Sequence, residues 1–118
     1  MGWLDRLFRM KPSTQAGEKE QAIIIALDGT SLPDEIYEQY DTSTLEDLLS
    51  VALGEIGECD GAEHGPGGSR IYIYGADAEA MFNSIESVLR EYPLAAGARV
   101  TIRSGPPGAR QRDIRLHT

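Results

Sequence analysis

The pattern of hydrophobic and polar residues predicts strands and helices in alternation along most of the chain. Residues 21–27, QAIIIAL, form a continuous apolar run of the kind found in a buried central strand. Residues 70–74, RIYIY, and residues 99–103, RVTIR, alternate between apolar and other side chains. Such alternation is typical of strands with one face toward the core. The chain therefore has three strong strand candidates.

Two amphipathic helices are predicted between these strands. Ser43 and Glu46 have the spacing of a capping box, and Gly57 supplies an end for the helix that follows. The apolar stripe of this helix consists of Leu45, Leu48, Leu49, Ala52, Leu53 and Ile56. The second helix begins after an Asp77 cap and ends at Pro93. Its stripe consists of Met81, Ile85, Val88, Leu89 and Tyr92.

Shorter elements are predicted in the remaining segments. Ser31 can cap a short helix over residues 33–40, although an irregular acidic loop fits these residues as well. Residues 58–64 can pair as an edge strand, and residues 65–68, GPGG, form a turn. Residues 113–116 are a candidate for one further strand.

The order of the stronger elements, strand, helix, strand, strand, helix, strand, predicts an α+β fold. Two right-handed βαβ-type units folded together give an antiparallel sheet with both helices on one face. This is the ferredoxin-like βαββαβ sandwich. One extra strand at the C-terminus is an alternative that the sequence does not decide. The length of 118 residues fits a single domain over residues 21–118.

Residues 1–20 are predicted to be an amphipathic segment followed by a polar linker. Leu4, Leu7 and Phe8 have the spacing of a short helix face. This helix can dock on the domain, contact a partner or lie weakly on a membrane. Docking is favoured over stable membrane anchoring, because two turns bury too little apolar area.

Charge is distributed unevenly along the chain. The formal net charge is −8, with thirteen acids and one base between Glu18 and Glu63, and with five arginines and one acid from Arg99 onward. One interpretation is an ordinary solvated surface. The other is an acidic face that attracts a basic partner. Either interpretation disfavours nucleic acid as a partner, because phosphate binding requires a basic track.

The single cysteine, Cys59, is informative about the cellular compartment in which the protein folds. One cysteine excludes an intramolecular disulfide, and no secretory signal is evident, so we expect a cytoplasmic protein. The longest apolar run, residues 22–27, is too short to span a membrane. Since Cys59 lies between Glu58 and Asp60, we expect a structural thiol and no nucleophile.

The polar residues closest together in the sequence are weak candidates for a metal site. These candidates are Glu58, Asp60, Glu63 and His64. The usual Cys/His spacing of a zinc site is missing. Acids on an edge strand also discourage edge-to-edge pairing, and we favour this explanation over metal binding. No cofactor and no catalytic residue are predicted.

The aromatic face of the strand at residues 70–74 is a second candidate site. Tyr72 and Tyr74 share this face, Arg70 precedes them, and Arg99 and Arg103 lie on the next predicted strand. Such a face can stack single-stranded bases. Cover by a terminal helix or by a second subunit is more common, and tyrosine suits a contact surface.

Three segments of the sequence resemble a group of small bacterial proteins without an assigned activity. The segments are GECDGAE at residues 57–63, IYIYGADA at 71–78 and PLAAGA at 93–98. The resemblance lies in a Gly-Glu-x-Asp-Gly-x-Glu run ahead of a Tyr-Gly-x-Asp-Ala junction, and it covers roughly residues 21–105. It supports the predicted fold and implies no activity.

The preferred functional hypothesis is a non-enzymatic binding protein for a basic protein partner. By charge and size alone it is similar to toxin-neutralising immunity proteins. The predicted contact residues are Asp34, Glu35, Glu38, Asp60, Glu63, Tyr72 and Tyr74. One alternative is a metal- or ligand-dependent enzyme or sensor that uses residues 58–64. Another is a structural homodimer formed through the Tyr72/Tyr74 face.

Overall fold

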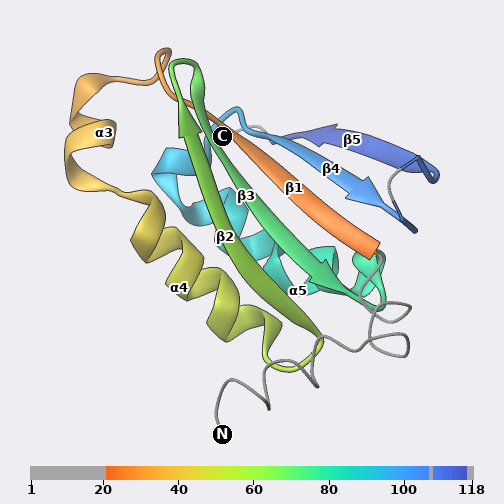
Figure 1. Ribbon diagram of the computed structural model, residues 1–118. Helices are drawn as coiled ribbons and strands as arrows, with labels where there is room; N and C mark the ends of the chain where they lie inside the picture. The colour runs from red at the N-terminus through yellow and green to blue at the C-terminus, as the bar shows by residue number, and fades with distance from the viewer. Residues whose placement is uncertain (1–20, 107, 117–118) are drawn as a thin grey trace, which may run out of the picture.

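A computed structural model describes residues 21–106 and 108–116, and in this part of the chain five strands form one antiparallel sheet (Figure 1). The strands are β1 (Gln21–Asp28), β2 (Gly57–Gly65), β3 (Gly68–Gly75), β4 (Arg99–Arg103) and β5 (Gln111–Arg115). The helices in the same part are α3 (Asp34–Gln39), α4 (Thr42–Leu53), α5 (Ala78–Glu91) and the 3₁₀ turn η1 (Pro93–Ala95). The predicted α+β class is confirmed.

The strands lie in the order β2-β3-β1-β4-β5, so the continuous apolar strand β1 is central, as predicted. Each neighbouring pair is antiparallel. The order differs from the predicted four-stranded ferredoxin-like sheet, because β5 extends the sheet beside β4. β5 begins two residues earlier than the predicted strand and ends one residue before it.

One face of the sheet packs against α4 and α5 and forms the core. Alternate residues of β1, β3 and β4 are buried on this face: Ile23, Ile25, Leu27, Ile71, Ile73, Val100 and Ile102. The helices contribute Leu45, Leu49 and Leu53 from α4, and Met81, Phe82, Ile85 and Leu89 from α5. These side chains belong to one hydrophobic cluster. The opposite face of the sheet carries none of these helices.

The structure corrects three predictions about α4. Asp41, and not Ser43, caps α4, because its carboxylate accepts a 2.7 Å hydrogen bond from the Thr44 amide. The helix ends at Gly54, whose φ of 58° suits glycine, so Ile56 lies outside the predicted stripe and is 45% exposed. Leu48 is 42% exposed and also faces away from the core.

Ser31 does not cap α3. The N-cap position is Pro33, and it makes no side-chain hydrogen bond. Instead, the Asp28 carboxylate accepts hydrogen bonds from the amides of Thr30 and Ser31, both at 2.9 Å, and so closes the turn after β1. These two bonds lower the pKa of Asp28.

The predicted amphipathic helix near the N-terminus and its linker lie outside the described residues. Within the described part of the chain, no helix combines the length and the apolar character needed to cross a bilayer.

Candidate functional site

The face of the sheet opposite the helices is the main candidate surface. Its centre is the side of β1 that faces away from the helices, formed by Ala22, which is fully buried, and by Ile24 and Ala26, which are partly buried. β1 pairs with β3 on one side and with β4 on the other, so each of these residues is the middle of a row that crosses the sheet. We call this surface the open face.

Strand register defines three rows on the open face. The first runs Glu63–Arg70–Ala26–Arg99–Arg115. The second runs Gly61–Tyr72–Ile24–Thr101–Asp113. The third runs Glu58–Tyr74–Ala22–Arg103–Gln111. Acids therefore line the β2 side of the face, and arginines dominate the β4 and β5 side.

A β-bulge brings two of the acids to the same face. The register of β2 on β3 shifts between Cys59 and Gly61, so that Asp60 is the extra residue. Gly61 has a φ of 125°, a conformation that glycine adopts without strain. Strict alternation would place Glu58 and Glu63 on opposite faces, since they are five positions apart along the strand. The bulge places both on the open face and turns Ala62 toward the helices, opposite Ile71.

Next to the bulge, a shallow hollow of about 310 Å³ combines acidic and aromatic groups. Its lining residues are Asp60, Gly61, Ala62, Glu63, Tyr72 and Tyr74. The Tyr72 hydroxyl donates a 2.8 Å hydrogen bond to the Glu63 carboxylate. This bond raises the pKa of the Tyr72 phenol, because the bonded proton is harder to remove. The structure thus brings together four of the seven residues predicted for partner binding.

The other three predicted residues, Asp34, Glu35 and Glu38, lie on α3 and are exposed. α3 packs beside η1, and it is anchored by Tyr37, whose hydroxyl donates to the Asp28 carbonyl at 3.1 Å. No hydrogen bond or ion pair joins these acids to Asp60 or Glu63 in the described residues. The acidic stretch of the sequence is therefore divided between two elements, α3 and β2.

The candidate metal ligands do not converge. His64 pairs across the strands with Ser69, and its Nδ1 lies 2.7 Å from the Ser69 hydroxyl. Glu58 and Glu63 lie on the open face, whereas the pair His64–Ser69 is on the other side of the hairpin. Within residues 21–106 and 108–116, no three His, Cys, Asp or Glu side chains form a group that could hold a metal ion.

The His64–Ser69 contact was not predicted from the sequence. An imidazole beside a hydroxyl can activate a nucleophile only if a third group orients the imidazole. No carboxylate bonds the second ring nitrogen in the described part of the chain. The contact therefore acts as a cross-strand bond between β2 and β3.

Cys59 is half-buried on the helix side of β2, opposite Ile73. Burial is the main cause that raises the pKa of its thiol, and the charges of Glu46, Asp60 and Asp47 raise the pKa further. A thiolate nucleophile requires the opposite environment. The expected structural role of Cys59 is consistent with this position.

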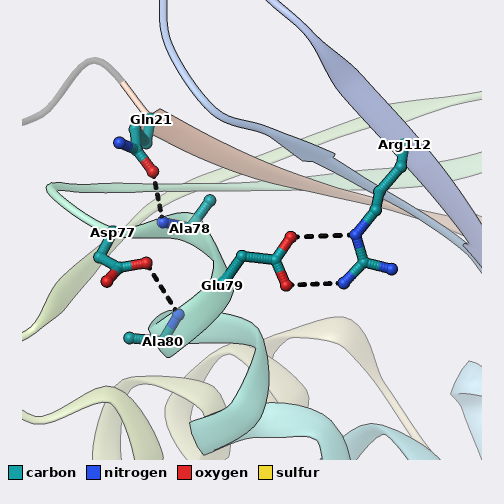
Figure 2. A network of polar contacts seen from close by, with 6 residues as sticks. All are labelled: Gln21, Asp77, Ala78, Glu79, Ala80 and Arg112. Atoms are coloured by element: carbon teal, nitrogen blue, oxygen red, sulfur yellow. Dashed lines mark hydrogen bonds and ion pairs between the residues drawn. The ribbon is translucent and has the colours of Figure 1, made fainter.

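Figure 2 shows how the N-terminus of α5 is fixed to the sheet. The Asp77 carboxylate accepts from the Ala80 amide at 3.1 Å, which confirms the predicted cap. The Gln21 side chain accepts from the Ala78 amide at 2.7 Å, so the start of β1 satisfies a second helix donor. Side chains therefore satisfy two of the amide donors at the start of α5.

The Arg112 guanidinium makes two hydrogen bonds with Glu79, one from Nε at 2.9 Å and one from Nη2 at 2.6 Å (Figure 2). The pair joins β5 to α5, and both side chains are about half exposed, at 53% and 50%. The bonds from Arg112 lower the pKa of Glu79 below its ordinary value of 4.5.

We expect the Glu79–Arg112 pair to make the free energy of unfolding depend on pH in the acid range. The folded-state pKa of Glu79 is lowered, so its stabilisation is complete above pH 4.5 and is lost as the pH falls through the lowered pKa. We expect Glu79→Gln to flatten this part of the profile of unfolding free energy against pH, measured by urea unfolding. Arg112→Lys keeps the charge but loses the two-bond geometry, so an intermediate profile is expected. A profile of Glu79→Gln identical to that of the native protein would contradict the assignment.

Comparison with protein-family models, curated proteins and solved structures finds no match to this chain. The resemblance to small bacterial proteins therefore stays a prediction.

Proposed function

We propose that the chain is a non-enzymatic cytoplasmic binding protein whose acidic β2 side holds a basic partner. The observation that carries the proposal is the hollow beside the bulge, where Asp60 and Glu63 border the exposed parts of two tyrosines. Carboxylates attract a cation, and the faces of Tyr72 and Tyr74 offer it cation–π contacts. The exposed acids Asp34, Glu35 and Glu38 on α3 act as steering charges that raise the association rate.

We infer in addition that strands β1 to β4 and the two longer helices form a ferredoxin-like core to which β5 is added. The order β2-β3-β1-β4 and the helical crossovers support this inference. The function of such a fold resides in its surfaces, so the inference does not by itself select an activity.

The proposal is tested by titrating the full chain with a short oligolysine peptide in low salt, read by calorimetry. We expect binding that weakens as salt is added, because exposed charges are screened. Glu63→Lys should weaken the affinity by about tenfold, since it replaces an attraction with a repulsion at the hollow. The double variant Glu35→Lys/Glu38→Lys should mainly slow association.

The matched control is Glu91→Lys, an exposed acid in the last turn of α5 on the helix layer of the fold. A cation at a helix C-terminus is favourable, so this variant keeps the fold while changing the net charge equally. If Glu63→Lys and Glu91→Lys weaken binding to the same extent, the peptide responds to net charge alone and the proposed site is wrong.

A further inference from the structure

We propose that the basic partner of the acidic β2 side is the arginine-bearing side of the open face on a second copy of this chain. The inference rests on the proposed function and names its partner. The two copies would stack open face to open face about a two-fold axis that runs along β1.

Charge complementarity is the first argument. Rotation about an axis along β1 keeps positions along the strands and exchanges the two sides of the sheet. β2 of one copy then faces β5 of the other, and β3 faces β4. Glu63 and Arg115 occupy the two ends of one row, so each Glu63 faces the Arg115 of the other copy. Tyr74 and Arg103 flank Ala22 in another row, so the same rotation sets Arg103, whose Nε donates to the Gly105 carbonyl at 2.7 Å, across from Tyr74.

Side-chain size gives a second argument. Tyr72 and Tyr74 are bulky and lie on one side of β1, whereas Thr101 on the other side is small. The same rotation sets Tyr72 over Thr101, and it sets Ile24 over its own symmetry mate at the centre. In this central row a large side chain therefore meets a small one, which suits close packing of two sheets.

Two other modes of self-association fit less well. Rotation about β1 also sets Arg70 over Arg99, one like-charge contact in the row where Glu63 meets Arg115. An axis across the strands would set Glu63 over Glu58 and Arg99 over Arg103, two like-charge contacts with no opposite-charge contact to offset them. Pairing through the β2 edge would meet the bulge at Asp60, which interrupts the regular ladder. The open face is thus the surface on which a second copy is complementary.

The size of the surface sets the concentration range for the test. Five strands about 4.8 Å apart, each five to nine residues long, give a face of roughly 400 Å². This is below the roughly 800 Å² per partner of a standard interface, so we expect a weak dimer with a Kd in the micromolar range.

The experiment is sedimentation velocity of the full chain over about 1–500 µM, a range that brackets such a Kd. We expect a concentration-dependent dimer. Glu63→Arg and Arg115→Glu should each raise the Kd by about tenfold or more, because each places like charges in both symmetric contacts. Glu91→Arg should leave the Kd unchanged, since it lies on α5 and off the open face.

Mixing the two reversed variants gives the sharpest outcome. In a heterodimer of Glu63→Arg with Arg115→Glu, both contacts between positions 63 and 115 again join opposite charges. We therefore expect the mixture to dimerise as the native chain does, although each variant alone stays mostly monomeric. An edge contact or a nonspecific effect of net charge would not produce this rescue.

Several results would overturn the inference. A native chain that is monomeric throughout the range contradicts it. A dimer whose Kd is unchanged by both Glu63→Arg and Arg115→Glu also contradicts it. A monomer that still binds oligolysine through Glu63 overturns the dimer and leaves the proposed function standing, whereas a chain that does neither overturns both.

Discussion

Replacing Gly68 with alanine should lower the free energy of unfolding by roughly 3 kcal/mol or more. Gly68 has a φ of 142°, in the region that favours glycine. A Cβ at this position would overlap the Leu27 carbonyl oxygen and would lie 3.0 Å from the Gly29 amide nitrogen. Both are backbone groups of the central strand and its turn, so neither can move aside as a side chain would.

The neighbouring glycine supplies the control for this prediction. A Cβ on Gly67 meets nothing within 4 Å, and its φ lies outside the positive range. Gly67→Ala should therefore change the stability by no more than about 1 kcal/mol, because alanine can even stabilise such positions through the unfolded state. Urea unfolding followed by circular dichroism compares the two variants. Equal effects would show that Gly68 is not in the close contact that the structure gives it.

If Gly68→Ala fails to fold, a substitution at Gly29, which faces Gly68 across the contact, keeps the prediction testable. A Cβ on Gly29 would lie 2.6 Å from the Gly68 Cα, so the two chains approach at this point from both sides. Gly29 also donates a 3.2 Å hydrogen bond to the Gly67 carbonyl. We expect Gly29→Ala to destabilise more than Gly67→Ala does.

This contact illustrates which part of the fold local sequence can predict. The GPGG turn is evident from its residues, because glycine and proline determine local conformation. The need for glycine at position 29 is not evident, because it arises from the approach of a loop 39 residues away in the chain. Periodicity correctly placed Ile71 and Ile73 of β3 on one face, because alternation holds along a regular strand. It cannot place the residues of β2, because the bulge between Cys59 and Gly61 shifts the alternation.

The candidate site depends on long-range placement even more strongly. Glu63 and Arg115 belong to opposite edges of the sheet, and only the strand order puts them in one row. The uneven charge was visible in the sequence as an acidic first half and an arginine-rich end. The sequence did not show which of the β2 acids face outward, because the bulge at Asp60 decides this.

Truncation of the two adjacent isoleucines of β1 should have very unequal effects. Ile25 is fully buried on the helix side, where its register partners are Ile71 and Val100. We expect Ile25→Ala to cost about 2–5 kcal/mol of stability, because it removes buried methyl groups and leaves a cavity between the sheet and its helices. Ile24 is only partly buried and faces outward, so Ile24→Ala should cost less than about 1.5 kcal/mol in the same urea unfolding experiment at low micromolar concentration.

The same pair of variants separates the core from the proposed interface. Ile24 lies on β1, along which the two-fold axis would run, so it would meet its own symmetry mate and Ile24→Ala should weaken the dimer with only a small effect on the stability of the monomer. Ile25 cannot touch a second copy, because the helices cover its side of the sheet. A loss of stability in Ile24→Ala as large as that in Ile25→Ala, measured at concentrations where the chain is monomeric, would mean that another part of the same chain packs on the open face, and would contradict its assignment to a second copy.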